Sequence, residues 1–467
     1  MHEEVFDVVF LGGGPAGYQG AIRAAQLGRR VAVVESRELG GVCLNRGCIP
    51  TKTIKASVDL LHRARRAKDY GLEIDGVIRP NIGAIIARKE KVVGLLRGGV
   101  AQLFRGNGIG LYEGSGRLVS PDELVVEGKN DTVRLKAKKI VLATGSRPFL
   151  PGPFAVDKQG VLTTDDILNI SAIPQSLIII GAGAIGVEMA SIMAELGSTV
   201  TLLEMEGRIL PREDAEMSAY LTRMLKRQKI KIITGISVTA VETGAKVRLT
   251  LSDGRAVEGD AILMASGRKP NIEEIGLTET GLELKSGQLV VNDRMETAIP
   301  GVYAAGDLTG GWLLAHVAFA EGIVAAENAS GLESRMDYRV VPRCIFSIPE
   351  YGAVGLSEEE AKERFPSRSF NFPLKSLGMA QAMGEWEGMV KLVVNEKNGE
   401  ILGGHIIGPH AGDLIAEISL AMQHGIPARG IMETIHTHPT LSEGVLEAAQ
   451  SACGQAIHIL PEKDSNG

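Results

Sequence analysis

The chain of 467 residues contains one glycine pattern twice, each copy set between a short apolar run and a helical pattern. The first glycine of this pattern permits a tight turn, the second lets the backbone approach a pyrophosphate, and the third lets the helix pack on the strand. The amides at the helix N-terminus then attract phosphate. Each copy therefore predicts a Rossmann-like unit that binds a dinucleotide. The glycines are Gly12, Gly14 and Gly17 in VVFLGGGPAG, and Gly181, Gly183 and Gly186 in SLIIIGAGAIG.

An acidic residue ends the second strand of each unit, 18 residues after the third glycine. These residues, Glu35 and Glu204, are placed to accept hydrogen bonds from a ribose. At the second unit, a carboxylate suits a free ribose 2′-hydroxyl and repels a 2′-phosphate, which favours NAD over NADP. Arg208 lies close by and keeps NADP open as an alternative, although the strand-end position itself is acidic.

Size and composition limit the fold class and the partners. A chain of this length predicts about three domains. The 44% of hydrophobic residues and the 58 glycines fit a large α/β protein. A net charge of −6 without a basic block argues against nucleic-acid and anionic-membrane partners. The apolar stretch 176–197 contains glycines and two glutamates, so we expect a strand, a turn and a helix there. The acidic N-terminus shows no secretory signal, and we expect a cytoplasmic protein.

Two of the four cysteines, Cys43 and Cys48, lie close together in GGVCLNRGCIPTK, just after the first unit. Four cysteines do not make a framework of structural disulfides, and a close pair in a cytosolic enzyme is typical of a catalytic or metal-binding site. A dithiol beside a flavin-type fingerprint suggests electron transfer between a disulfide and a nucleotide cofactor. The alternative is a buried dithiol without chemistry. The other cysteines are Cys344 and Cys453.

The C-terminal third, from about Tyr338, lacks glycine fingerprints; strands are expected at 389–395 and 401–408 and a helix at 412–424. Its segment THTHPTLSEGVLEAA places Glu443 five residues after His438, where a carboxylate can orient an imidazole and raise its basicity. The alternative is a surface turn that caps a helix. His436 and His438 also suggest a metal site, but nothing nearby completes a ligand set.

Eight motifs, taken in order, make the chain resemble the flavoprotein disulfide reductases along essentially its whole length, and within them the members that oxidise dihydrolipoyl groups. The resemblance implies an α/β fold with two Rossmann-like domains, the first for FAD and the second for NAD, and a C-terminal α+β dimerisation domain. The implied domains are 1–147 (FAD), 148–270 (NAD), 271–338 (return to the FAD domain) and 339–467 (dimerisation). The motifs are GGGPAG, GGVCLNRGCIPTK, ATGSRP, GAGAIGVE, GRKPN, GVYAAGD, LAHVAFAEG and HTHPTLSE.

The resemblance also assigns roles to the residues at matching positions. It implies a homodimer in which His438 and Glu443 of one subunit complete the active site of the other. The implied catalytic residues are Cys43, Cys48, His438, Glu443, Lys52 and Glu188. The implied FAD contacts are Gly12, Gly14, Gly17, Glu35, Lys52, Thr144, Gly145, Asp307 and Ala315. The implied NAD contacts are Gly181, Gly183, Gly186, Glu204 and Gly267, and no metal is implied.

The implied reaction is the oxidation of dihydrolipoyl groups through a Cys43–Cys48 disulfide and FAD, with reduction of NAD⁺. The expected partner is free dihydrolipoamide or a lipoyl-bearing protein, such as the core of a 2-oxoacid dehydrogenase complex or the H protein of glycine cleavage. Two alternatives stay open: an NADH-dependent reductase of another disulfide, and a flavin-binding assembly subunit with little turnover. Arg46 stands where an aliphatic residue is common in the family, and we hypothesise that its charge lowers a thiol pKa.

Overall fold

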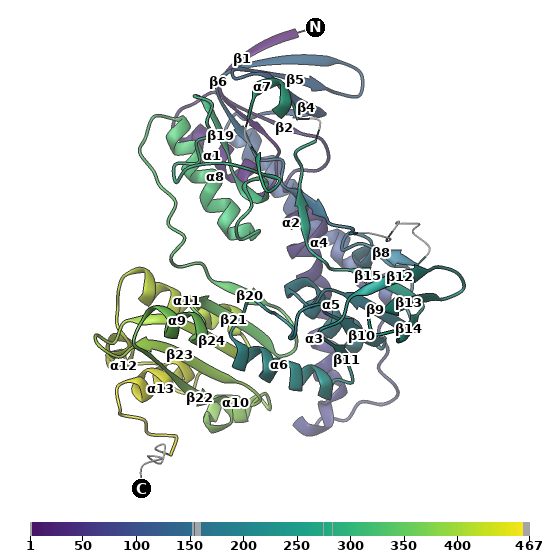
Figure 1. The fold of residues 1–467 in the computed structure, drawn as a ribbon, viewed down its shortest axis with the longest axis vertical. Helices are drawn as coiled ribbons and strands as arrows, with labels where there is room; N and C mark the ends of the chain where they lie inside the picture. Colours follow the sequence, from purple (N-terminus) through teal and green to yellow (C-terminus); the bar gives the residue numbers. More distant parts are fainter. Residues whose placement is uncertain (1, 152–153, 155–159, 274, 283, 461–467) are drawn as a thin grey trace.

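The computed structural model describes residues 2–151, 154, 160–273, 275–282 and 284–460. Three large sheets with helices packed around them make up the chain, in agreement with the predicted α/β class (Figure 1). No helix among the described residues is long and apolar enough to cross a membrane. The apolar stretch 176–197 instead forms a strand, a turn and a helix, as predicted.

The first sheet has the strand order β3-β2-β1-β6-β5-β4, with β19 beside β6. Five of its strands run parallel, and β4 and β5 form an antiparallel extension from β6. The central strand is covered on both faces, which explains its apolar run at 8–11. The strands are β1 (His2–Leu11), β2 (Val31–Glu35), β3 (Gly110–Glu113), β4 (Ser115–Ser120), β5 (Glu123–Glu127), β6 (Thr132–Leu142) and β19 (Val302–Ala304).

Two helices from distant parts of the sequence, α1 (Pro15–Gln26) and α8 (Ala315–Ala329), lie side by side against this sheet (Figure 1). A Cβ at Gly322 would lie 2.1 Å from the carbonyl oxygen of Ala16, and one at Gly20 would lie 2.6 Å from that of Gly322. Glycine at these positions therefore permits the close approach. Together with β19, α8 returns the chain to the first unit after the second unit has been completed.

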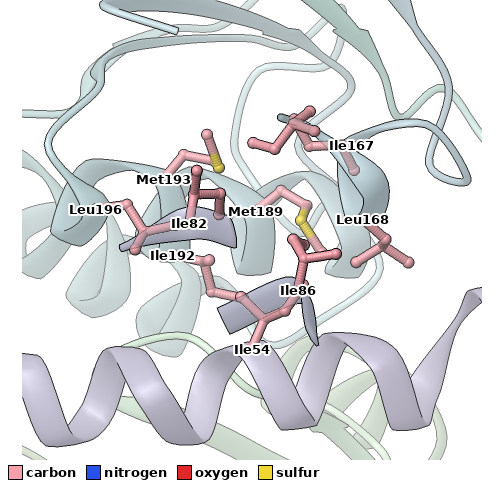
Figure 2. Close-up of a pocket in the computed structure, with 10 residues that line it drawn as sticks. Ile54, Ile82, Ile86, Ile167, Leu168, Met189, Ile192, Met193 and Leu196 are labelled. Atoms are coloured by element: carbon pink, nitrogen blue, oxygen red, sulfur yellow. The ribbon is translucent and has the colours of Figure 1, made fainter. Parts of the chain in front are cut away.

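A helical layer connects the first two units. It consists of α2 (Gly41–Arg46), α3 (Cys48–Arg65), the 3₁₀ helix η1 (Ala67–Tyr70) and α4 (Ile82–Gly106). Side chains of α3, α4 and the second unit converge on a small apolar pocket, shown in Figure 2. Ile54 of α3, Ile86 of α4 and Met189 of the second unit all line it. This apolar packing holds α3 and α4 against the second unit.

The second sheet is parallel throughout, in the order β11-β10-β9-β15-β8. Helix α5 (Ala184–Leu196) follows β9, and α6 (Ala215–Arg227) follows β10. The strands are β8 (Val161–Leu162), β9 (Ser176–Ile180), β10 (Thr199–Leu203), β11 (Lys231–Ile233) and β15 (Ala261–Met264). A three-stranded antiparallel sheet precedes β15 and consists of β12 (Val238–Glu242), β13 (Val247–Leu251) and β14 (Ala256–Gly259).

An antiparallel pair of short strands, β7 (Ser146–Pro148) and β16 (Arg268–Pro270), carries the chain into and out of the second unit. The expected domain bounds at 147/148 and 270/271 fall within or directly after these strands. The segment that follows contains α7 (Leu277–Thr280), β17 (Leu284–Lys285), β18 (Gln288–Leu289) and η3 (Gly306–Thr309), and η2 (Ile167–Asn169) lies after β8. The division into domains stays a prediction.

The C-terminal part is built on an antiparallel sheet in the order β20-β21-β24-β23-β22. The predicted strands 389–395 and 401–408 are β23 and β24, and the predicted helix is α11, shifted by one residue. All residues of β23 and β24 are buried, because helices cover both faces of the sheet. The elements are β20 (Arg343–Ile345), β21 (Glu350–Gly355), α9 (Glu358–Arg364), β22 (Ser367–Pro373), η4 (Leu374–Ser376), α10 (Gly378–Ala382), β23 (Met389–Asn395), β24 (Ile401–Gly408), α11 (Ala411–Gln423), α12 (Ala428–Glu433) and α13 (Glu443–Ala452).

Candidate active site

The two close cysteines lie on either side of a helix break. α2 ends at Arg46 and α3 begins at Cys48, while Cys43 lies on α2. A Cβ at the intervening Gly47 would lie 3.0 Å from the carbonyl oxygen of Val42, so a larger residue would crowd the turn. Both cysteines are free thiols, and each shifts the pKa of the other. The turn therefore holds the two sulfur atoms in position for dithiol–disulfide chemistry.

The two thiols differ in acidity. The hydrogen bond with Cys43 and the charge of Lys52 lower the pKa of Cys48 to about 7, although burial and the carboxylate of Glu188 oppose this. The same hydrogen bond, burial and the charge on Cys48 raise the pKa of Cys43 far above its ordinary range. Near neutral pH, the negative charge of the pair therefore resides on Cys48 and the proton on Cys43.

A partly buried ion pair lies beside the cysteine turn. The Lys52 ammonium, one turn into α3, lies 3.0 and 3.1 Å from the two carboxylate oxygens of Glu188 on α5. Glu188 is 6% exposed and also accepts a hydrogen bond of 2.9 Å from the amide of Phe346. The ammonium lies 4.2 Å from the centre of the Phe346 ring. Because the three residues come from different parts of the chain, the pair fixes α3 and α5 to the start of the C-terminal sheet.

Arg46 has a different role from the one hypothesised. Its Nη1 donates to Glu38 Oε2 at 2.5 Å, and its Nε lies 3.6 Å from Asp165 Oδ2. The main influences on the two thiol pKa values are the other thiol, burial and Lys52, with Glu188 for Cys48. Two carboxylates therefore engage the guanidinium charge, and the structure does not support a lowering of either thiol pKa by Arg46.

The chain's own packing requires the first and third glycines of both fingerprints, but not the second. A Cβ on the first would lie 2.2 Å from a carbonyl oxygen in the first unit and 2.5 Å in the second. A Cβ on Gly17 or Gly186 would lie 1.8 Å from the carbonyl oxygen of the first glycine. At Gly183 a Cβ would meet nothing within 4 Å, and at Gly14 only a backbone carbon at 3.7 Å. The second glycines thus keep open the space at the N-termini of α1 and α5 that a pyrophosphate would fill.

The strand-end acids are held identically in the two units. One oxygen of Glu35 accepts a hydrogen bond of 2.8 Å from the amide of Gly13, and the other accepts one of 2.8 Å from the amide of Arg37. The two oxygens of Glu204 likewise accept bonds of 2.6 Å from the amide of Ala182 and 3.0 Å from the amide of Glu206. Each carboxylate is therefore fixed next to its glycine turn, as a ribose contact requires.

Arg208 is engaged within its own loop. Its Nη2 donates to the carbonyl oxygens of Pro211 at 3.1 Å and Glu213 at 3.0 Å. A guanidinium used in this way is not free to bind a 2′-phosphate, and the neighbouring Glu204 would repel one. The geometry therefore favours NAD over NADP at the second unit.

The small-residue turns expected near FAD and NAD lie at the ends of parallel strands. Gly145 and Gly267 follow β6 and β15 and have φ values of 71° and 114°, which favour glycine. The Thr144 hydroxyl donates to the carbonyl oxygen of Asn271 at 2.7 Å, and the Thr144 carbonyl oxygen accepts a bond of 2.9 Å from Nδ2 of Asn271. The ATGSRP and GRKPN motifs therefore lie together, and Ala315 begins α8.

Asp307 lies in η3, where the return segment rejoins the first unit. Its Oδ2 accepts a hydrogen bond from the hydroxyl of Ser146 and lies 3.8 Å from Nε of Arg268. A carboxylate not anticipated from the sequence supports this turn: Glu321 of α8 accepts a bond of 2.7 Å from the amide of Gly306 and one of 2.7 Å from the Tyr338 hydroxyl. Burial raises the pKa of Glu321 to about 6, and Asp307 contributes in the same direction. The glutamate of LAHVAFAEG was the available signal, but its partner lies across the fold.

His438 and Glu443 form a pair, with 2.7 Å between Nδ1 and Oε1. Burial raises the pKa of Glu443, but the hydrogen bonds from the Thr440 amide and from His438 lower it more. The pKa of Glu443 therefore lies below its ordinary range. The His438 side chain is 77% exposed, and Figure 1 shows the segment between α12 and α13 far from α2. The structure of one chain therefore does not bring His438 to Cys43 and Cys48. His436 forms a second pair with Glu417, at 2.7 Å.

Comparison with known proteins assigns the chain to a family. Residues 6–322 match the family described as pyridine nucleotide-disulphide oxidoreductase, and residues 341–449 match the dimerisation domain of the same family. The chain belongs to this family. Its members here are oxidoreductases that use FAD and NAD, and this chain is therefore a flavin- and NAD-dependent oxidoreductase that forms a homodimer.

Relatives match this oxidoreductase over nearly its full length. Dihydrolipoyl dehydrogenase from Bacillus subtilis is 42% identical, with 97% of this chain and 99% of the relative covered. The protein of the same name from Chlamydia trachomatis is 41% identical, with 98% of this chain and 99% of the relative covered. Among solved structures, LpdA from Mycobacterium tuberculosis has a TM-score of 0.90 at 30% identity, covering 97% of this chain and 99% of that one. The Cu(II) complex of the flavoprotein disulfide reductase RclA from Escherichia coli has a TM-score of 0.86 at 28% identity, covering 96% and 99%.

Proposed function

We propose that this oxidoreductase is a dihydrolipoyl dehydrogenase, which oxidises dihydrolipoyl groups and reduces NAD⁺. The observation that carries the proposal is the dithiol turn, in which Cys43 and Cys48 flank a helix break and Cys48 lies one turn before Lys52 of the Lys52–Glu188 pair. The curated relatives from Bacillus subtilis and Chlamydia trachomatis, which carry this activity in their names, support it.

The residues at the dithiol turn would act in the following order on the oxidised enzyme. His438 of the partner subunit, oriented through Nδ1 by the partner's Glu443, takes a proton from one substrate thiol at Nε2. The resulting thiolate attacks the sulfur of Cys43, so that a mixed disulfide forms and the Cys43–Cys48 bond breaks. Cys48 then holds a thiolate. The second substrate thiol attacks the first substrate sulfur in the mixed disulfide, which closes the lipoyl disulfide and releases Cys43, and the proton of that thiol passes to the released Cys43 sulfur.

The electron pair now on the dithiol is passed on to complete the cycle. FAD, when bound, would accept this pair and deliver it as hydride to NAD⁺. We assign FAD to the first fingerprint, with Glu35, Thr144, Gly145, Asp307 and Ala315, and NAD to the second, with Glu204 and Gly267. The Lys52 ammonium would stabilise the negative charge that develops near the dithiol turn. The domains would be 1–147, 148–270, 271–338 and 339–467.

The proposed substrate is the dihydrolipoyl group of another protein, or free dihydrolipoamide. Lipoyl groups are carried by the cores of 2-oxoacid dehydrogenase complexes and by the H protein of glycine cleavage, and we propose such a chain as the partner in the cytoplasm. The mild charge of −6 gives no reason to expect nucleic acid as a partner.

A second candidate is an NADH-dependent reductase of another disulfide. The likeness to RclA, which is described as a disulfide reductase, favours it. The dithiol turn would serve both directions, because thiol–disulfide exchange is reversible.

An anaerobic titration tests the proposal. Dihydrolipoamide added to the flavin-loaded enzyme should produce the long-wavelength absorbance of a thiolate next to oxidised flavin, and NAD⁺ added afterwards should yield NADH. The Cys48→Ser variant should lack that absorbance. Reduction by NADH without any response to dihydrolipoamide would contradict the proposal and favour the second candidate.

A further inference from the structure

The loop that follows Glu204, residues 204–214, is attached to the second fingerprint at its beginning and middle. The Glu204 carboxylate accepts the amide of Ala182, and the amide of Leu210 donates to the carbonyl oxygen of the same Ala182 at 2.8 Å. Leu210 has a φ of 46°, which a leucine rarely adopts. The loop ends at Asp214, which caps α6 through a bond of 3.1 Å from the Met217 amide. The position of Glu204 therefore depends on how this loop is held.

Arg343 of β20, in the C-terminal part, binds the loop near its end through the carboxylate of Glu213. Its Nε and Nη2 make three contacts of 3.0, 3.1 and 3.2 Å with the carboxylate of Glu213, which also accepts the Tyr351 hydroxyl at 3.2 Å. The side chains of Arg343 and Glu213 are only 13% and 11% exposed. The guanidinium also lies 5.2 Å from the ring centre of Trp312, just before α8. Such a planar, two-pronged contact restrains the carboxylate in direction as well as distance.

Lys391 of β23 holds the next residue of the loop. Its ammonium is fully buried and lies 3.0 Å from Asp214, 2.9 Å from Glu216 and 2.7 Å from Glu358. Burial disfavours the charge, but these carboxylates together raise the pKa of Lys391 above its ordinary range, so it stays charged. Glu213 and Asp214 are adjacent, and the C-terminal sheet thus binds both through buried cations.

We propose that Arg343 and Lys391 are positioning residues for NAD. By fixing the end of the 204–214 loop to the C-terminal sheet, they keep Glu204 in place for the ribose, although neither cation touches the dinucleotide. The inference rests on the proposed assignment of NAD to the second fingerprint. It makes the affinity for NAD depend on a part of the chain that contains none of the proposed NAD contacts.

Calorimetric titration of NAD⁺ into the oxidised, flavin-loaded enzyme tests this proposal. Arg343→Met should raise the Kd for NAD⁺ by about 5-fold or more, the lower end of the usual range for coupling between separate sites. Arg343→Lys keeps the charge but loses the two-pronged contact, so its Kd should be intermediate. In turnover, KM for NAD⁺ should rise while kcat stays unchanged. The matched control is Arg227→Met, because Arg227 of α6 also pairs with the C-terminal part, at Glu387, but 66% of its side chain is exposed.

Four outcomes would overturn the inference or separate it from the proposed function. A Kd for NAD⁺ that is unchanged in both Arg343 variants overturns it, as does an equal rise in the Arg227→Met control. If reduction of the flavin by dihydrolipoamide falls in parallel with NAD⁺ affinity, the residues support the fold in general and the inference is wrong. A wild-type enzyme that binds no NAD⁺ would instead contradict the proposed function. Lys391→Met should likewise raise the Kd for NAD⁺. It removes a buried charge, and if this variant does not fold, the Arg343 variants decide the test.

Discussion

At the scale of single residues, the hydrogen bond with Cys43 lowers the pKa of Cys48 most, and two opposed charges adjust it. Lys52 favours the thiolate, whereas Glu188, only 3.0 Å from that ammonium, disfavours it. The hydrogen bond with Cys43 has the largest effect on Cys48 and places the thiolate on the residue at the N-terminus of α3. An acidic thiol at this position is a good leaving group when a substrate thiolate attacks Cys43, because a lower thiol pKa speeds departure.

Replacing Lys52 with methionine should make the Cys48 thiol less acidic. We expect the pH midpoint for alkylation of Cys48 in the reduced enzyme to rise by about one unit or more, the usual effect of losing a nearby opposite charge. Mass spectrometry of iodoacetamide-treated peptides at a series of pH values measures this. Arg46→Val is the matched control, because its guanidinium is bound to Glu38 and Asp165. A rise of similar size in Arg46→Val would restore the hypothesis that Arg46 acts on the thiols.

Glu321 should make the stability of the protein depend on pH between about 4.5 and 6. Burial raises its pKa from 4.5 to about 6, so the folded chain holds this proton more tightly than the unfolded chain. The free energy of unfolding should therefore fall as the pH rises through this window, by about 2 kcal/mol at most. Glu321→Gln should remove this loss of stability with rising pH, because the glutamine side chain does not titrate. Its amide can still accept a hydrogen bond from the Gly306 amide and donate one to the Tyr338 hydroxyl oxygen. Urea unfolding at pH 5 and 7.5 measures the difference, and equal pH dependence in both proteins would refute it.

At the scale of the structural element, the strand–turn–helix units separate packing from ligand binding. Gly186→Ala should destabilise the second unit by roughly 1–3 kcal/mol, because its Cβ would lie 1.8 Å from a carbonyl oxygen. Gly183→Ala should leave the unfolding temperature unchanged, since its Cβ would meet nothing within 4 Å. It should nevertheless raise KM for NAD⁺ on the order of 10-fold, because the methyl group occupies the space left for a pyrophosphate. Thermal unfolding and steady-state kinetics test the pair, and a stable Gly183→Ala enzyme with unchanged KM would argue against NAD binding at α5.

The elements that the sequence predicted well are those whose signal is local. Both glycine units, the strands 389–395 and 401–408, and the helix after them are encoded in periodicity and turn residues. Glu321 and Arg343 were not recognised, because their partners at Gly306 and Glu213 depend on how distant segments pack. The same reason applies to the hypothesis that Arg46 lowers a thiol pKa. Its closeness to the thiols in the sequence did not reveal its ion pairs with Glu38 and Asp165.

At the scale of the whole molecule, a single chain contains all the proposed catalytic groups but does not bring them together. The dithiol turn lies between the first two units, whereas the segment between α12 and α13 lies far from α2 (Figure 1). This segment contains His438, whose side chain is largely exposed. Ile435, three residues before it, is 98% exposed, and Leu460 is 91% exposed. A dimer interface would cover such apolar side chains and could bring His438 to the partner's Cys43.

Mixing two inactive variants tests whether the dimer shares its active sites. Cys43→Ser and His438→Gln homodimers should each have little activity, since every site lacks one group. In a mixed dimer, one site combines both defects and the other contains Cys43 of one subunit and His438 of the partner, both intact. Random reassociation of equal amounts should therefore restore roughly a quarter of the wild-type activity, because half the dimers are mixed and each has one complete site. The control mixes Cys43→Ser with Cys48→Ser, which lie in the same turn and leave no complete site in any dimer. If the first mixture stays as inactive as this control, His438 does not act across the dimer, and each chain must supply its own base.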